Sequence, residues 1–146
     1  MKTILLLHGP NLNRLGARAV EHYGTITLAD LEALVTKEAT TLGYALKTFQ
    51  SNHEGALIDW LQAEAPPAAG VIINPGALTH TSYALHDALF DTGLPCIEVH
   101  LSDIHSREPW RAISVIAPAC VEQITGKKEA GYAEAVRLLH HHITKK

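Results

Sequence analysis

Glu98 and His100 stand two residues apart at the end of an apolar run, and this spacing could support proton transfer. Residues two apart on a β-strand point to the same face, so the carboxylate and the imidazole are expected to be neighbours. A carboxylate beside an imidazole orients the ring and favours its protonated form, which suits a general acid. The alternative is a histidine at a strand end whose hydrogen-bonding needs are simply met by a neighbour.

Tyr23 is the second candidate for proton transfer, in the role of a base. A phenol ionises near pH 10 and needs roughly 4 kcal/mol of stabilisation to act near pH 7. One cation at about 4 Å supplies an energy of that order at an effective dielectric constant of about 20. Arg18 lies close by in the sequence and can be that cation if the loop folds back. Otherwise Tyr23 is a packing residue.

The arginines are concentrated in two long polar segments, whereas every lysine lies elsewhere. The arginines of these segments are Arg14, Arg18, Arg107 and Arg111. A guanidinium group binds carboxylate or phosphate in a planar, bidentate manner, so we expect an anionic ligand rather than solvated arginines alone. The absence of lysine there argues against Schiff-base chemistry. The sequence has no glycine-rich phosphate-binding pattern and no Cys-x-x-Cys pair, which argues against a nucleotide, a flavin or a zinc ion.

Short apolar runs alternate with helical patterns along the chain. The runs expected to be strands are residues 3–7, 45–50, 71–74, 96–100 and 112–116. Runs of this length suit strands that are buried on both faces of a parallel sheet. The segments expected to be helices are residues 28–42, 54–64, 82–92 and 131–142. This alternation predicts an α/β, flavodoxin-like fold with strand order 2-1-3-4-5 and helices on both faces, formed by residues 1–146 as one domain.

Two connections, residues 8–27 and 101–111, are longer than the usual length of about two to six residues. In a parallel sheet the carboxyl ends of the strands share one edge, where ligands bind. Polar side chains that follow the strands are therefore expected to converge there. Gly16 and Gly24 flank Arg18 and Tyr23, so we expect residues 13–24 to form a lid that closes on the ligand.

The composition predicts a soluble, globular, cytoplasmic protein. About 47% of the residues are apolar and the formal net charge is −3, which argues against nucleic acid as the main partner. No apolar run approaches the roughly 18 residues that span a bilayer, so no membrane contact is expected. The amino-terminal residues lack the pattern of a signal peptide. The two cysteines, Cys96 and Cys120, do not make a disulfide framework.

Four segments carry a family resemblance that covers nearly the whole chain. They are residues 7–16 (LHGPNLNRLG), 49–55 (FQSNHEG), 73–82 (INPGALTHTS) and 98–108 (EVHLSDIHSRE). In order and spacing they resemble type II 3-dehydroquinate dehydratases. The resemblance implies a lyase of the shikimate pathway that converts 3-dehydroquinate into 3-dehydroshikimate by anti elimination through an enolate. It also implies no cofactor, no metal and a homododecamer built as a tetramer of trimers.

The resemblance further implies roles for individual residues. Tyr23 resembles the general base, and Arg18 resembles the residue that stabilises its charged form. Asn11 resembles the group that holds the water at the enolate, whereas His100, oriented by Glu98, resembles the acid that protonates the leaving hydroxyl. The implied substrate contacts are Asn74, His80, Leu101, Ser102 and Arg111, together with Asp87, which is implied to reach into a neighbouring subunit's site.

One departure from the family pattern lies in the expected lid. Ala19 and Val20 follow Arg18 where the family usually has Glu and Pro, although the spacing from Arg18 to Tyr23 is kept. A proline fixes one backbone angle, so its replacement is expected to loosen the open lid.

The competing class is a non-enzymatic flavodoxin-like binding or receiver module. A receiver needs clustered acidic residues after the first strand, and residues 8–11 (HGPN) have none.

Overall fold

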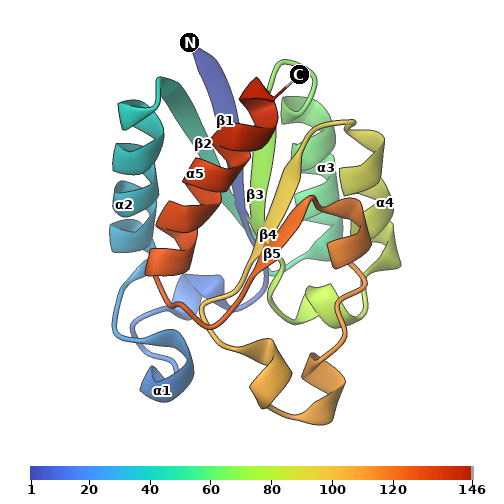
Figure 1. Cartoon of the computed structure of the whole chain (residues 1–146). Helices are drawn as coiled ribbons and strands as arrows, with labels where there is room; N and C mark the ends of the chain where they lie inside the picture. Colours follow the sequence, from blue (N-terminus) through green and yellow to red (C-terminus); the bar gives the residue numbers. More distant parts are fainter. Residues whose placement is uncertain (146) are drawn as a thin grey trace.

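The computed structural model describes residues 1–145 and contains a five-stranded parallel sheet (Figure 1). The strands are β1 (Lys2–His8), β2 (Tyr44–Gln50), β3 (Gly70–Asn74), β4 (Cys96–Val99) and β5 (Glu122–Ile124). They lie in the order β2-β1-β3-β4-β5, which confirms the predicted flavodoxin-like order. Because every pair is parallel, the carboxyl ends of all strands meet at one edge of the sheet.

Helices cover both faces of the sheet (Figure 1). The main helices are α2 (Leu28–Thr41) and α5 (Ala130–Thr144) on one face, and α3 (Glu54–Glu64) and α4 (Tyr83–Asp91) on the other. The central strand β1 packs against the helices on both faces of the sheet, because successive strand residues point to opposite faces. Ile4 and Leu6 pack against α2 and α5, whereas Leu5 and Leu7 pack against α3 and α4. Within residues 1–145 no helix is long and apolar enough to cross a membrane.

The strand expected at residues 112–116 is wrong, because the fifth strand is Glu122–Ile124. Residues 112–116 run beside the segment that follows β3, where the Val115 amide donates to the Thr79 carbonyl at 2.7 Å. The Ser114 hydroxyl is bonded to Glu98, and Ile116 is fully buried in the core beneath α3 and α4. The apolar character of this run therefore reflects packing against the core and not pairing within the sheet.

The long connection after β1 contains local structure of its own. It includes a 3-10 turn at Leu12–Arg14 and the four-residue helix α1 (Val20–Tyr23), which projects beyond the carboxyl edge of the sheet (Figure 1). Gly24 ends α1 with a φ of 72°, a left-handed conformation that glycine adopts without strain. The chain then enters α2, where the Thr27 hydroxyl caps the helix by accepting from the Asp30 amide at 3.2 Å.

The ends of β1 and β3 are pressed together at Gly9 and Pro75. A Cβ atom on Gly9 would lie 2.3 Å from the Pro75 carbonyl oxygen, so a larger residue does not fit. The Gly9 amide donates to the Asn74 carbonyl at 2.7 Å, which continues the pairing of the two strands into their loops. This close approach carries the segment after β1 across the end of β3 and forms one wall of the site.

Candidate active site

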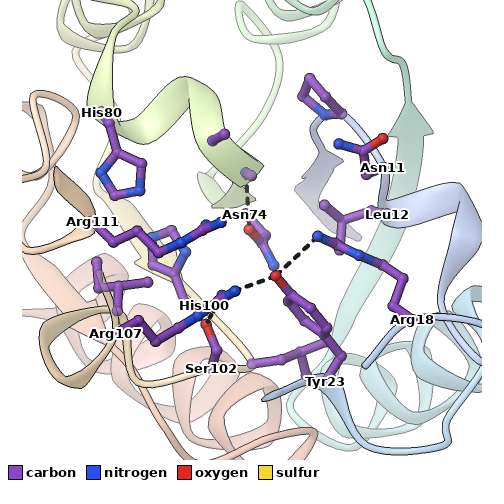
Figure 2. A pocket seen from close by; sticks show the side chains of 15 residues that line it. Asn11, Leu12, Arg18, Tyr23, Asn74, His80, His100, Ser102, Arg107 and Arg111 are labelled. Atoms are coloured by element: carbon purple, nitrogen blue, oxygen red, sulfur yellow. Dashed lines mark hydrogen bonds between the residues drawn. The ribbon is translucent and has the colours of Figure 1, made fainter. Parts of the chain in front are cut away.

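Tyr23, the last residue of α1, has its phenol oxygen between two arginines (Figure 2). Arg18 Nη2 and Arg107 Nη1 each donate to this Oη atom over 2.9 Å. The Arg18 guanidinium also covers the ring, with Cζ 3.8 Å from the ring centroid. The loop thus folds back as the sequence suggested, and the phenol oxygen lies in contact with two positive charges.

Arg18 lies in a crowded, positively charged environment. Burial lowers the pKa of the Arg18 guanidinium, Tyr23 acts in the opposite direction, and the charges of Arg107 and Arg111 lower it further. The group stays protonated, because the ordinary pKa of arginine lies above 12. An anion in this place, whether a phenolate or a bound ligand, relieves the repulsion among the three guanidinium groups.

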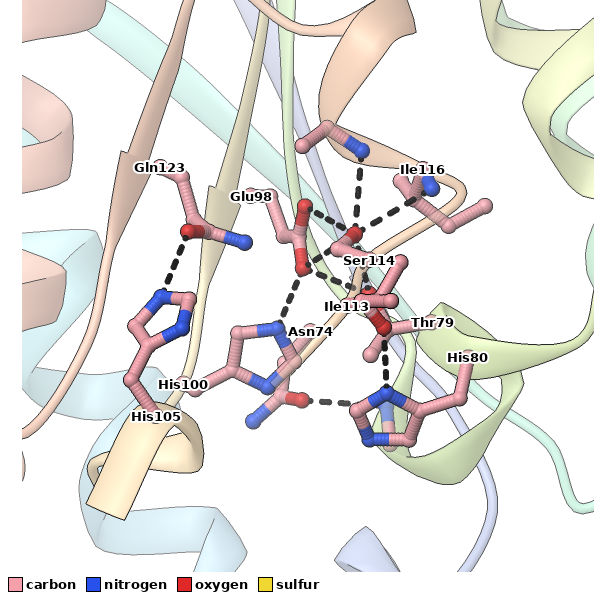
Figure 3. A network of polar contacts seen from close by, with 12 residues as sticks. Asn74, Thr79, His80, Glu98, His100, His105, Ile113, Ser114, Ile116 and Gln123 are labelled. Atoms are coloured by element: carbon pink, nitrogen blue, oxygen red, sulfur yellow. Dashed lines mark hydrogen bonds and ion pairs between the residues drawn. The ribbon is translucent and has the colours of Figure 1, made fainter. Parts of the chain in front are cut away.

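Glu98 is fully buried beneath the cavity and holds the His100 ring (Figure 3). Its Oε2 atom lies 2.5 Å from His100 Nε2 and accepts from the Thr79 hydroxyl, also at 2.5 Å. The Ser114 hydroxyl donates to Oε1 at 2.8 Å. Three partners therefore fix the carboxylate, and the carboxylate fixes the ring, which leaves His100 Nδ1 as the nitrogen available to a ligand.

The charge state of Glu98 follows from these contacts. Burial by itself raises the pKa of Glu98, but the hydrogen bond and charge of His100, with hydrogen bonds from Thr79 and Ser114, hold it below the usual value. The carboxylate is consequently ionised at neutral pH. The ionised carboxylate therefore lies directly against Nε2 of the His100 ring.

Two asparagines at the carboxyl edge are held by their neighbours. Asn74 Nδ2 donates to the Tyr132 hydroxyl at 3.0 Å, and its Oδ1 accepts from the Gly76 amide at 3.0 Å. Burial raises the pKa of Tyr132, which keeps this phenol neutral. Asn11 has a φ of 73°, and its backbone amide donates to Asn52 Oδ1 at 2.9 Å. Its backbone is anchored in this way, and its own side chain faces the cavity.

The rim of the cavity is aromatic and cationic. His80 Nδ1 donates to the Ile113 carbonyl at 2.8 Å, and the His80 ring meets Trp110 edge-on with centroids 5.3 Å apart. Arg111 Cζ lies 4.1 Å from the Trp110 ring centroid, a cation–π contact, and its Nε donates to Glu108 at 3.0 Å. These contacts direct the Arg111 guanidinium toward the cavity (Figure 2).

The cavity at this edge has a volume of about 100 Å³, which suits a small polar ring better than a dinucleotide. Most residues expected at the site line it: Asn11, Arg18, Tyr23, Asn74, His80, His100, Leu101, Ser102 and Arg111. Glu98 lies directly behind His100. Asp87, by contrast, is on the outer face of α4, where it pairs with His86 at 2.9 Å and is 75% exposed. The chain's own cavity therefore does not include Asp87.

The side chains that line the cavity carry positive charge. Among residues 1–145, Arg18, Arg107 and Arg111 line it, and no Asp, Glu or Lys does. This is the arrangement that an anionic ligand needs, and it offers no amine for a Schiff base. Among residues 1–145 no group of three or more His, Cys, Asp or Glu side chains is placed to hold a metal ion.

Three contacts of the site were not expected from the sequence, which places Arg107 near an anionic ligand but does not show what it bonds to. Arg107 belongs to an arginine-containing loop, but nothing in its spacing shows that it reaches Tyr23. Thr79 is one of several polar residues after β3, and its bond to Glu98 depends on the path of the turn that follows. Ser114 was hidden within the run mistaken for a strand. For these three contacts the sequence offered one signal, the concentration of arginines in two polar segments, and it pointed only to Arg107.

Comparison with known proteins shows to which family this site belongs. A sequence model described as dehydroquinase class II matches residues 2–140. The chain belongs to the dehydroquinase class II family. It is 54% identical, over 93% of its length, to a 3-dehydroquinate dehydratase of Roseiflexus castenholzii, and the match covers 87% of that protein. It is 52% identical, over 92% of its length, to catabolic 3-dehydroquinase 1 of Neosartorya fischeri, with 90% of that protein covered.

Solved structures of dehydroquinases share the fold. The type II dehydroquinase of Propionibacterium acnes superposes with a TM-score of 0.91 at 38% identity, and the match covers 97% of each chain. A 3-dehydroquinate dehydratase-like protein of Bifidobacterium longum gives a TM-score of 0.74 at 30% identity, covering 99% of this chain and all of the other. The family resemblance of the four segments is confirmed, and the competing receiver or binding module is set aside.

Proposed function

We propose how this dehydroquinase removes water from 3-dehydroquinate to give 3-dehydroshikimate, a reaction of the shikimate pathway. The substrate carries a ketone at C3, acidic protons at C2, and a hydroxyl and a carboxylate at C1. Tyr23 takes a C2 proton, and His100 protonates the C1 hydroxyl as it leaves. The observation that carries the proposal is the Tyr23 phenol oxygen, bonded to two guanidinium groups in the same cavity as the His100–Glu98 pair.

In the first step Tyr23 acts as a phenolate, which Arg18 and Arg107 stabilise. The C2–H bond breaks, the proton passes to the Tyr23 oxygen, and the electron pair moves through C2 and C3 onto the ketone oxygen. The product is an enolate. Asn11, whose side chain lies at the cavity, holds a water molecule that donates a hydrogen bond to the enolate oxygen.

In the second step the enolate collapses and the bond between C1 and its hydroxyl oxygen breaks. His100 supplies a proton through Nδ1, because Nε2 is bonded to Glu98, and the hydroxyl leaves as water. A double bond forms between C1 and C2, conjugated with the ketone. Exchange of protons with solvent then restores the Tyr23 phenolate and the His100 imidazolium. An anti elimination removes the proton and the hydroxyl from opposite faces of the substrate ring. Tyr23 approaches from the loop after β1 and His100 from the edge of the sheet, which suits this geometry.

The remaining cavity residues hold the substrate. Arg111 and His80 at the rim, with Asn74 and Ser102 deeper in the cavity, offer charged and polar groups to the carboxylate and ring hydroxyls. Leu101 is buried, so it contributes an apolar contact with the substrate ring together with its own backbone groups. The proposal needs neither a cofactor nor a metal ion, because both proton transfers use side chains of the cavity.

Deuterium exchange separates the two proton transfers. In deuterated water, His100→Gln should still exchange the C2 proton of 3-dehydroquinate, as followed by NMR, while producing no conjugated-enone absorbance. Tyr23→Phe should abolish both exchange and dehydration, because no enolate forms. If His100→Gln lost exchange but kept dehydration, or if Tyr23→Phe kept both, the assignment of base and acid would be wrong.

We propose in addition a homododecamer, a tetramer of trimers, in the cytoplasm. The outer face of α4 presents Tyr83 and Phe90, which are 70% and 68% exposed, on either side of Asp87. Trp110 and Ile113, which contact the rim residue His80, are also exposed. Such a patch suits a second copy of the chain. A partner seated here offers its Asp87 carboxylate to a cavity that has arginines and no acid of its own.

The two free cysteines, Cys96 and Cys120, support the proposed cytoplasmic location, because thiols stay reduced in that compartment.

Assembly is tested by light scattering and by mixing variants. The wild-type protein should have the mass of twelve chains, whereas Phe90→Asp should give smaller species. Tyr23→Phe and Asp87→Asn should each be impaired alone, and mixed assemblies should regain activity, because some sites combine an intact base with an intact partner carboxylate. Asp91→Asn, also on α4, is the matched control. A fully active monomer would contradict the proposed assembly.

A further inference from the structure

Within residues 1–145, the outer part of the lid (residues 18–24) is joined to the rest of the chain by two hydrogen bonds. One is the bond from Arg107 to Tyr23. In the other, Lys128 Nζ donates to the backbone carbonyl of Glu21 on α1 at 3.0 Å. We propose that Lys128 is a positioning residue that latches the lid to the loop between β5 and α5, and so keeps Tyr23 in place for proton transfer.

The backbone of Lys128 is in an unusual conformation. Its φ is 51°, in the left-handed region that residues other than glycine rarely adopt. Among residues 1–145 the only other non-glycine residue with a positive φ is Asn11, which lines the cavity. Glycine would occupy this position at lower conformational cost. Strain of this kind persists where neighbouring contacts compensate for it, and it is concentrated at functional segments.

The backbone of the same loop is anchored to the substrate side of the cavity. The Lys128 amide donates to the Leu101 carbonyl at 3.1 Å, and the Gly126 amide donates to the Ser102 carbonyl at 3.0 Å. Leu101 and Ser102 both line the cavity. Lys128 therefore connects the loop after β4, through its backbone, with the lid, through its side chain.

The side chain of Lys128 holds the end of α1 in two ways. Its methylene stem lies against Gly24, where an added Cβ atom would come within 3.2 Å of Lys128 Cδ. Its ammonium group bonds to the Glu21 carbonyl, one of the helix-end carbonyls that lack a partner within so short a helix. Tyr23 lies between these two contact points, so movement of α1 away from Lys128 would also move the phenol oxygen away from the cavity.

Hydrogen exchange of the assembled protein tests the latch directly. In Lys128→Met, which keeps a long stem but removes the donor, the amides of residues 20–24 should exchange at least about fivefold faster than in the wild type. Lys128→Arg, which keeps a donor, should restore protection. Lys127→Met is the matched control, because the Lys127 ammonium group bonds to Glu134 on α5 and not to residues 18–24. Unchanged exchange in Lys128→Met, or equal changes in both Met variants, would overturn the proposal.

Activity gives the second measurement. Lys128→Met should lower kcat roughly threefold or more while KM changes less, because Lys128 does not contact the substrate. Lys128→Arg should recover most of this loss. This readout rests on Tyr23 being the base, whereas hydrogen exchange does not. If exchange increased but kcat stayed normal, the positioning role for Tyr23 would be wrong even though the latch exists.

Lys128→Gly separates the latch from the stability of the fold. Glycine relieves the left-handed strain and removes the whole side chain, so Tm should stay equal to or above that of the wild type. Lid exchange should nevertheless increase and kcat should fall, as in Lys128→Met. A glycine variant with normal lid protection and normal kcat would show that the side chain holds nothing.

Discussion

Arg107 Nη1 lies 2.9 Å from the Tyr23 phenol oxygen, although 84 residues separate the two in the sequence. This contact joins the lid after β1 to the long connection after β4. The same guanidinium nitrogen donates to Ser102 Oγ at 3.2 Å, so one arginine bridges the proposed base and a proposed substrate contact. In the proposed mechanism the two loops therefore act together only while residues 18–24 stay against the loop after β4.

Tyr23→Phe tests the base. The substitution removes the phenol oxygen but keeps the ring that Arg18 covers, so kcat should fall at least ~100-fold, the usual scale for general acid–base catalysis. Substrate affinity should change little, because Tyr23 meets the substrate only at the C2 proton and the other cavity side chains are unchanged. Steady-state kinetics, with the product inhibition constant as a measure of binding, checks both parts. Tyr44→Phe is the control, because Tyr44 begins β2 at the sheet edge away from the cavity and its hydroxyl bonds to His140. Near-normal turnover in Tyr23→Phe would remove Tyr23 from the base role.

Arg18→Ala tests the stabilisation of the phenolate through the pH profile. The base must be deprotonated to act, and loss of a cation disfavours its charged form. The limb on which kcat/KM rises with pH should therefore move to higher pH, and kcat at pH 7 should fall. Arg107→Ala should shift the same limb in the same direction, because both guanidinium groups contact the phenol oxygen.

Arg14→Ala is the control for that experiment. Arg14 belongs to the same connection but does not line the cavity, so its removal should leave the profile in place. An Arg18→Ala enzyme that changed only KM would show that Arg18 binds substrate and does not stabilise the base.

Most of the fold could be predicted because its strands are continuous apolar runs. Strands β1, β3 and β4 are buried along almost their whole length and end abruptly in polar residues, which is the pattern of a sheet covered on both faces. The fifth strand could not be predicted. Of its three residues only Ile124 is buried, and the more apolar run at residues 112–116 lies shortly before it. Burial against α3 and α4 explains that run equally well.

The site could be predicted where it depends on local geometry. Glu98 and His100 meet because strand residues two apart share a face, and Arg18 lies near enough to Tyr23 for one turn of the loop to join them. Contacts across long separations could not be predicted. The bond from Lys128 to Glu21 spans 107 residues and depends on two loop paths that no spacing encodes.

Chelation and borohydride treatment test whether side chains suffice for the chemistry. No lysine of the described part of the chain lines the cavity, so borohydride added with substrate should leave no covalent adduct, as measured by intact-protein mass spectrometry. Prolonged treatment with a chelator should leave kcat unchanged once the chelator is removed. A stable mass increase with borohydride, or activity restored only by added metal, would contradict the proposed mechanism.

Glu98→Gln tests the buried carboxylate through the pH dependence of stability. The folded-state pKa of Glu98 lies below its usual value, so the ionised carboxylate adds stability above the unfolded pKa of about 4.3, and this stability is lost as the pH falls through the folded pKa. Glutamine cannot accept from His100 and from both hydroxyls as an anion does. At pH 7 the variant should therefore be less stable by about 2 kcal/mol.

The difference in stability between Glu98→Gln and the wild type should shrink steadily below pH 5. Thermal unfolding from pH 7 to pH 4 measures this, with Glu122→Gln, at the exposed first residue of β5, as the control. A Tm difference that stayed constant with pH would mean that Glu98 stabilises the fold through packing and not through its charge.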